Sequence, residues 1–186
     1  MKEVVYHGTA SNNLEELINE IVTNGFVYKY RDNHWLGQGI YFFDKYEWAE
    51  RWAKQPINFN KDKCVFSARI FCRDNEFLDL DSVKVQYKVS EYIKKINDEI
   101  YLKSNEIFFN DDINKRRCFY LDIIKKEYNY KILKHSFVID NNNDITRDIG
   151  LNVVQIQYCV SDNTCIFDAS VLKKIPAVKR KKLNIK

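Results

Sequence analysis

Glycine is scarce in this chain and is concentrated near its start. The 186 residues include five glycines, and four of them lie in the first forty positions: Gly8, Gly25, Gly37 and Gly39. A chain this poor in glycine is expected to place it where the backbone needs a positive φ or where another group approaches closely. The three tryptophans and two of the three histidines fall in the same region: Trp35, Trp48, Trp52, His7 and His34. We therefore expect the segment 4–43 to build a ligand site.

Composition favours one folded domain. Hydrophobic residues make up 45% of the sequence and aromatic residues 15%, which is enough to bury a core and argues against disorder. No apolar run has the length of a membrane-spanning helix, and the first residues, MKEVVYHGT, lack the pattern of a signal peptide. We expect a cytoplasmic protein without a membrane partner. Its five scattered cysteines are expected to be reduced and buried: Cys64, Cys72, Cys118, Cys159 and Cys165.

Charge is only mildly unbalanced, at +4, but basic residues crowd the end of the chain. We expect one domain over 1–175, with a helical insertion at about 82–135, and a basic tail over 176–186. Such a tail could neutralise phosphate groups and add salt-dependent affinity for nucleic acid. By itself, a basic terminus is more often simply solvated.

The order of expected elements is mixed. The first expected helix follows a cap at Asn12 and ends at Gly25, and the second follows a cap at Asp44 and ends before Pro56. A further helical segment is expected across 82–126. A turn is expected at 140–144. Strands are expected at 3–6, 39–43, 65–71, 76–80, 130–138, 153–160 and 165–171. Because strands and helices do not alternate regularly, this order predicts an α+β fold.

Three motifs in combination resemble one known family. His7-Gly8-Thr9 follows a strand, the segment 36–42 (LGQGIYF) comes some thirty residues later, and a helix with Ala49 and Trp52 follows. This arrangement resembles the ADP-ribosyltransferase superfamily, in the branch of the poly(ADP-ribose) polymerases and diphtheria toxin. The resemblance continues more weakly at 67–70 and 77–80 and returns at 154–160, whereas 82–135 does not match. It implies two packed, mostly antiparallel sheets with a helical insertion, and NAD in the cleft between the sheets.

The first motif carries over to the NAD-binding residues of that family. His7 looks like the histidine that bonds a ribose hydroxyl of the adenosine half of NAD. Gly8 looks like the residue whose backbone pairs with the nicotinamide carboxamide, and Thr9 would line the same pocket. A ligand lying against the main chain would explain the glycine.

The second and third motifs supply the expected walls for the nicotinamide ring. Tyr41 looks like the tyrosine that packs on this ring, and Trp52 falls where relatives often have a second aromatic. Ala49 stands where the family has a small residue that leaves room for the ring. Without the resemblance, Tyr41 would fit an ordinary buried strand equally well, and Trp48 with Trp52 would more often be a core pair.

The strand at 153–160 departs from the family pattern. Gln157 stands where the family usually has the glutamate that stabilises the positive charge of the transition state. An amide keeps the hydrogen bond but supplies no charge, and loss of such a term commonly costs on the order of 10²–10³ in rate. Gln155 points in the same direction along a strand, so either amide could face the ligand. Asp162 is the nearest downstream acid, and Gln157 could also simply bond a neighbouring strand.

The resemblance implies transfer of a single ADP-ribose from NAD to an acceptor, with release of nicotinamide and no metal. The expected catalytic residues are Gln157, Tyr41 and His7. It suggests a bacterial toxin from a toxin–antitoxin or anti-phage system, with an antitoxin as partner. RNA is favoured over protein as acceptor, because a basic tail and aromatics near the site suit single strands.

Three alternatives stay open. The protein could be a non-catalytic module that binds NAD or ADP-ribose, for which Gln157 is the main argument. It could be an RNA 2′-phosphotransferase, although no clear arginine and histidine set for that reaction is present. A zinc site from Cys159, Cys165 and His135 is the third, with spacing that matches no usual pattern.

Overall fold

The structure, a computed structural model, describes residues 1–102, 112–139 and 152–178. The described part is a mixed α/β fold with four α-helices: α1 (Leu14–Asn24), α2 (Tyr46–Ala53), α3 (Val83–Leu102) and α4 (Ile113–Tyr128). Its seven strands are β1 (Lys2–Ser11), β2 (Ile40–Phe43), β3 (Asp62–Phe71), β4 (Phe77–Asp79), β5 (Ile132–Ile139), β6 (Val153–Val160) and β7 (Ile166–Ile175).

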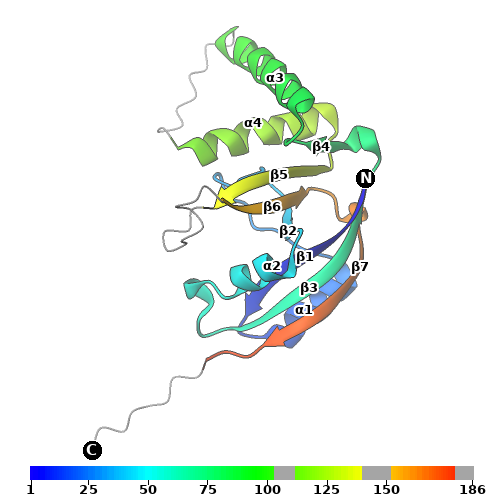
Figure 1. The fold of residues 1–186 in the computed structure, drawn as a ribbon, viewed down its shortest axis with the longest axis vertical. Coiled ribbons are helices and arrows are strands. Elements are labelled where there is room, and N and C mark those ends of the chain that lie inside the picture. The colour runs from blue at the N-terminus through cyan, green and yellow to red at the C-terminus, as the bar shows by residue number, and fades with distance from the viewer. Residues whose placement is uncertain (103–111, 140–151, 179–186) are drawn as a thin grey trace, which may run out of the picture.

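All seven strands belong to one hydrogen-bonded sheet, in the order β4-β5-β6-β2-β1-β3-β7. Neighbours are antiparallel except for the parallel pair β4–β5. The prediction of two packed sheets is therefore wrong at the level of connectivity. The physical reason lies at the centre, where β1 and β2 pair only at Tyr6 and Phe43. One residue pair joins a β4-β5-β6-β2 half to a β1-β3-β7 half, and the two halves run in different directions (Figure 1).

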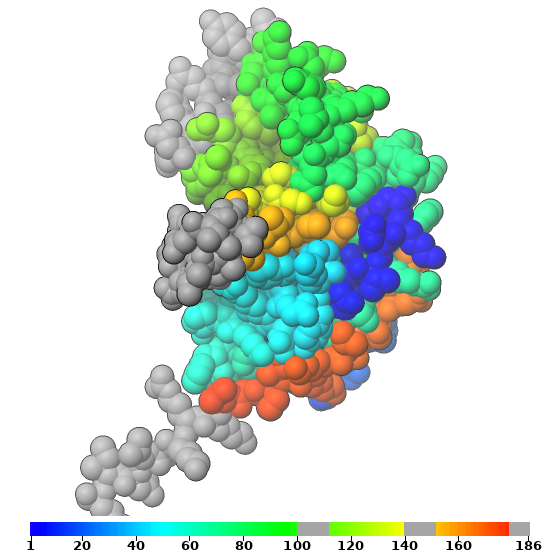
Figure 2. Space-filling model, viewed as in Figure 1, coloured from blue at the N-terminus to red at the C-terminus, as the bar shows by residue number. Residues whose placement is uncertain are grey.

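Different helices cover different parts of this sheet. The apolar face of α1 packs into a cluster with residues of β1 and β3 and with Ile40 and Phe42 of β2. Residues of α3 and α4 bury a second cluster against β4, β5 and β6, at the end of the molecule opposite β7 (Figure 1). Helix α2 packs on β1 through a third, smaller cluster. On the visible surface, the segment around α2 (cyan) lies between β6 (orange) and β7 (red-orange) (Figure 2).

Most expected helices and strands are confirmed, but several begin or end at other residues than predicted. β6 has the predicted bounds, and Gly25 ends α1 with its N–H bonded to the Ile21 carbonyl at 3.0 Å. β1 is longer than predicted because it pairs with β3 along ten residues. The helix caps are wrong: Asn13, not Asn12, precedes α1, and Asp44 makes no capping bond to α2.

The described residues of the predicted helical segment 82–126 form the two helices α3 and α4. Strand β5 begins at Ile132, so the expected insertion of 82–135 includes the first residues of a sheet strand. The expected turn at 140–144 and most of the basic tail, 179–186, lie outside the described residues.

Candidate functional site

Four residues form a row across the middle of the sheet, here called the central row. Tyr6 lies opposite Phe43, Phe43 opposite Gln157, and Gln157 opposite His135. Directly opposed residues in an antiparallel sheet share one face. Tyr41 lies two residues before Phe43 and therefore shares that face. The structure thus brings Tyr41 and Gln157 to one face of adjacent strands.

His7 lies beside the central row on the other face. Its ring packs edge-on against Phe26, with centroids 5.0 Å apart, and lies 5.6 Å from the Phe42 ring. Nδ1 is 2.8 Å from the main-chain oxygen of Tyr41. Since a carbonyl only accepts, this bond places the proton on Nδ1 and leaves Nε2 as an acceptor in the neutral ring. Burial lowers the pKa of His7, although the bond to Tyr41 raises it.

The close approach expected at Gly8 is made by the protein itself. A Cβ at this position would lie 1.9 Å from the carbonyl oxygen of Ala49 and 3.2 Å from the backbone nitrogen of Ala53. Ala49 is fully buried and packs with Phe43 and Val65. Gly8 and Ala49 therefore let α2 sit directly on β1, and this packing accounts for both small residues without a ligand. Thr9, next in β1, is half-buried opposite Cys64 of β3.

Tyr41 uses its hydroxyl within the protein. The hydroxyl accepts from the backbone N–H of Leu36 at 2.6 Å and donates to the Gly37 carbonyl at 2.8 Å. Burial raises the pKa of this phenol. The ring edge meets His34, with centroids 5.4 Å apart. Tyr41 thus holds the loop that precedes β2, and its ring packs against the cluster formed with α3 and α4.

The tryptophans occupy different environments. Trp52 is 47% exposed and contacts Phe43, with ring centroids 6.3 Å apart. Trp48 is half-buried against the α2 cluster, as expected for a core residue, and Arg51 lies over its ring at 5.6 Å. Trp35 is 36% exposed and packs on Phe137 of β5 at 4.6 Å. Trp52 and Trp35 are therefore the tryptophans with rings available to a ligand.

The Gly37-Gln38-Gly39 loop is held by α4, in the segment that the family resemblance does not cover. Asp122 Oδ1 accepts from the Gln38 N–H at 2.7 Å, and Lys125 Nζ donates to the Gln38 carbonyl at 2.5 Å. Asp122 and Lys125 pair with each other at 2.8 Å. Gly37 has φ +77°, and a Cβ there would lie 2.3 Å from Asp122 Oδ1. Sequence reasoning missed this support; its signal is a carboxylate and an amine three residues apart, next to the buried Leu121 and Ile124 of α4.

Gln157 is 5% exposed, and its Nε2 donates to Gln155 Oε1 at 2.5 Å. Both amides lie on the face of the central row, but Gln157 faces Phe43 and His135, whereas Gln155 faces Phe137. Asp162 does not join them. Its carboxylate accepts from the Thr164 N–H at 2.9 Å and pairs with Lys131 at 3.1 Å, beyond the end of β6.

A carboxylate holds the histidine of the central row. His135 Nδ1 lies 2.8 Å from Asp81 Oδ1, as an ion-pair contact without hydrogen-bond angles. Asp81 accepts from the N–H of Ser136 at 2.8 Å and from its hydroxyl at 2.7 Å. Burial favours the protonated acid, but these bonds outweigh it and lower the pKa of Asp81. Sequence reasoning considered His135 only for zinc and did not connect it with Asp81.

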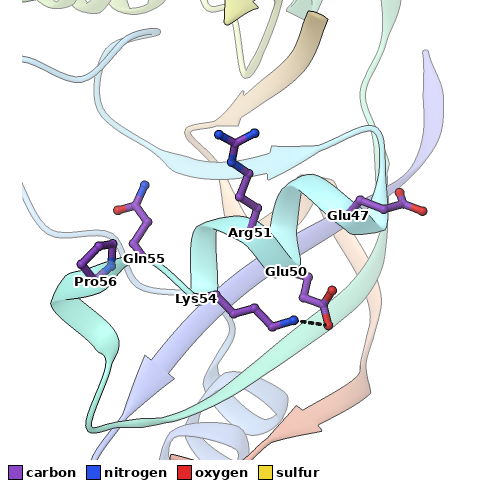
Figure 3. A pocket seen from close by; sticks show the side chains of 6 residues that line it. All are labelled: Glu47, Glu50, Arg51, Lys54, Gln55 and Pro56. Atoms are coloured by element: carbon purple, nitrogen blue, oxygen red, sulfur yellow. Dashed lines mark ion pairs between the residues drawn. The ribbon is translucent and has the colours of Figure 1, made fainter. Parts of the chain in front are cut away.

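Among the surface hollows formed by described residues are three that do not include His7, Tyr41 or Gln157. The largest of these three, about 570 Å³, lies along the outer side of α2 (Figure 3). Its ion pair, Lys54–Glu50 at 3.1 Å, is on the side away from Arg51 (Figure 3). Within the described residues, no group of three metal-ligating side chains is placed to hold a metal ion. Cys159 and Cys165 belong to different core clusters, so they do not form the zinc site with His135.

Comparison with known proteins gives no functional assignment. No family model matches the chain. An uncharacterized protein of Methanocaldococcus jannaschii is 21% identical over 192 residues, which covers 94% of this chain and 86% of that protein. Among the helices that the structure describes, none combines the length and apolarity needed to cross a membrane.

Proposed function

We propose that this chain is an NAD-dependent mono-ADP-ribosyltransferase with an ADP-ribosyltransferase-like fold. What supports the proposal is one observation: His7, Tyr41 and Gln157, from motifs far apart in the sequence, lie on the neighbouring strands β1, β2 and β6, where the two halves of the sheet meet. The family resemblance implies that these three strands are neighbours. Tyr41 and Gln157 share one face of the sheet, whereas the His7 ring lies on the other face against Phe26 and Phe42. Core packing by itself does not require a histidine, a tyrosine and an amide at this junction.

The residues at this junction fit NAD in several respects. His7 donates through Nδ1 to Tyr41, so its Nε2 is an acceptor suited to a ribose hydroxyl. Trp52 offers a half-exposed ring for stacking on a nicotinamide. Beyond Tyr6, β1 has β3 on one side and no ladder with β2 on the other. A strand edge outside a ladder suits the carboxamide of the ligand, which needs one donor and one acceptor.

The reaction breaks the bond between the ribose carbon and the nicotinamide nitrogen, and nicotinamide leaves with the bonding electron pair. The acceptor then bonds to the same carbon. Gln157 supplies a hydrogen bond near this carbon without a negative charge. Such an enzyme depends on positioning more than on charge stabilisation, and single transfer fits it better than chain building.

RNA is the acceptor that we favour, over protein. Exposed Trp35 and Trp52 rings suit stacking on unpaired bases, and Arg117 of α4 lies 5.5 Å from the Phe137 ring beside Trp35. The net charge of +4 favours a polyanion. A cytoplasmic toxin of a toxin–antitoxin or anti-phage system, with an antitoxin partner, fits such an activity.

A second candidate is a module that binds NAD or ADP-ribose without turnover. The specific observation in its favour is that Gln157 carries no charge and uses one of its two amide N–H donors on Gln155. The two candidates differ in one product, since only the enzyme releases nicotinamide.

Substitution of Trp52 tests the proposed function without disturbing the core, because the side chain is exposed. Purified protein is incubated with NAD, and nicotinamide is measured by chromatography. Trp52→Ala is expected to lower nicotinamide release by about 5- to 150-fold, since a stacking contact contributes about 1–3 kcal/mol. Tyr87→Ala, an exposed aromatic on α3, is the matched control and should leave release unchanged. NAD binding without nicotinamide release by the wild type would favour the binding module.

A further inference from the structure

We propose that His135, oriented by Asp81, is the general base that takes the proton of the acceptor, a role that rests on the proposed transferase function. The acceptor is then a group whose attacking atom carries a hydrogen, a hydroxyl or an N–H. Gln157 cannot fill this role, because an amide does not accept a proton near neutral pH.

His135 is placed beside the reacting centre that the proposed function defines. It lies directly opposite Gln157 in the β5–β6 ladder and shares its face of the sheet. Opposed side chains in such a pair start about 4.5–5.5 Å apart at Cβ. An acceptor that attacks a ribose carbon held by Gln157 therefore comes within reach of the imidazole.

The second nitrogen of the imidazole is buried and faces a carboxylate. Nδ1 is inaccessible to solvent and faces Asp81 Oδ1 at 2.8 Å. Asp81 is itself fixed, because Ser136 donates to both of its oxygens and Lys134 Nζ lies 3.3 Å from Oδ2. A carboxylate behind a histidine sets its tautomer and stabilises the imidazolium that forms on proton transfer.

The other side of the imidazole is open. The His135 side chain keeps 32% of its surface, and because Nδ1 is covered, the exposed part lies elsewhere on the side chain. Its edge packs on the Phe137 ring at 4.7 Å, and Phe137 in turn carries Trp35. The open side thus borders the aromatic surface to which we assign the acceptor.

The step balances without a further reactant. The bond between the ribose carbon and the nicotinamide nitrogen breaks, and its electron pair leaves with neutral nicotinamide. The acceptor O–H or N–H forms the new bond to carbon, and its proton moves to His135 Nε2. Asp81 stays ionised, and solvent later removes the proton from the imidazolium.

Few charged groups face His135 in the part of the chain that the structure describes. Asp81 precedes α3, and Lys134 lies next to His135 in β5 with its amine 3.0 Å from Asp79. From β6 the facing side chains are the uncharged Gln157 and Gln155. From α4, Arg117 lies over the neighbouring Phe137. Asp81 is thus the one charge placed directly against the imidazole by these contacts.

Substitution of His135 in the full chain tests this role. Labelled NAD is incubated with cell extract as the source of acceptor, and transfer, nicotinamide release and NAD binding are measured for each variant. His135→Gln is expected to lower kcat for transfer by about 10²–10⁴, the usual contribution of a general base, with NAD affinity unchanged. Val138→Thr, exposed on the other face of β5, is the matched control.

Imidazole rescue separates a chemical role from a structural one. Added imidazole is expected to raise the transfer rate of His135→Gly at least tenfold. Asp81→Asn is expected to transfer more slowly than the wild type while still melting as a folded protein. Nicotinamide release by the wild type, together with full transfer by His135→Gln or no rescue by imidazole, overturns the role of His135 alone. No nicotinamide release by the wild type overturns the proposed function and this inference with it.

Discussion

At the scale of single residues, the pair Gln157–Gln155 decides what kind of chemistry the site supports. The two amides bond each other at 2.5 Å, so the one that faces the ligand is oriented by the other. Since Gln157 lies opposite Phe43 and His135, we assign it the contact with NAD and assign Gln155 a positioning role.

This assignment predicts unequal effects of two matched substitutions. Gln157→Ala is expected to lower nicotinamide release by about 10² or more, because a preorganised donor at the reacting carbon is lost. Gln155→Ala should cost clearly less and should leave NAD affinity nearly unchanged. Steady-state assays of both variants check this, and a larger loss in Gln155→Ala would reverse the two roles.

A second prediction at this scale concerns pH. Burial, opposed by the bond to Tyr41, lowers the pKa of His7 below the ordinary 6.5, and burial and the charge of Arg31 lower that of His34. The unfolded chain then binds more protons than the folded one below about pH 6.5. The contribution of neutral His7 and His34 to the free energy of unfolding is therefore fully present above about pH 6.5. It is lost as the pH falls through the pKa values of the folded protein.

Urea unfolding at pH 7, 6 and 5 measures this effect. The free energy of unfolding should fall across this range, and His7→Gln should flatten the fall. Carboxylates affect stability at lower pH. The hydrogen bond from Lys173 lowers the pKa of Glu50 to about 2, so the contribution of Glu50 to the free energy of unfolding is lost as the pH falls below about 4.5. An unchanged slope between pH 7 and 5 in His7→Gln would contradict the buried, neutral histidine.

At the scale of elements, α4 matters because it supports the loop before β2. Asp122 and Lys125 bind the backbone of Gln38 from 84 and 87 residues away. Lys125 is 7% exposed, and its amine has few other partners. The helical segment therefore shapes the site although it carries none of the family motifs.

Lys125→Met is expected to destabilise the protein by about 2 kcal/mol or more, because it leaves the Asp122 charge and the Gln38 carbonyl without their partner. Lys126→Met, an exposed neighbour on the same helix, should stay within about 0.5 kcal/mol. Chemical denaturation of both proteins gives the values. Additive costs in Lys125→Met/Asp122→Asn would mean that the two side chains do not act as a pair.

The helices and strands could be predicted from the sequence more accurately than the contacts between them. The alternating run 153–160 and the stop at Gly25 predicted β6 and the end of α1, because both depend on local chemistry. The single sheet, the seat of α2 on Gly8 and the support of Gln38 by α4 were missed, because each depends on contacts between distant residues. The glycines were rightly assigned to close approaches, but at Gly8 and Gly37 the approaching group is protein.

For the candidate site, Tyr41 and Gln157 share one face of the neighbouring strands β2 and β6, His7 lies on the other face of β1, and Asp162 lies elsewhere. The contact between Asp81 and His135 could not be predicted, because the two lie on segments 54 residues apart that meet only at the edge of β5. Pairs of this kind have no local signature in a sequence.

At the scale of the whole molecule, the sheet consists of two halves joined at one residue pair, Tyr6–Phe43. Ligand contacts from β1 and from β2 with β6 therefore belong to different halves. The proposed NAD site lies at this junction. Trp52 on α2 contacts Phe43 of β2, and Trp35 before β2 contacts Phe137 of β5.

The central claim is that this junction transfers ADP-ribose from NAD. Its most direct measurement is incubation of the protein with NAD labelled in the adenylate phosphate and with cell extract, followed by separate treatment with RNase and with protease. We predict nicotinamide release and labelled macromolecule that RNase removes, both reduced in Trp52→Ala. Label removed only by protease would correct the acceptor to protein. A folded protein that binds NAD but releases no nicotinamide and leaves no label would contradict the claim.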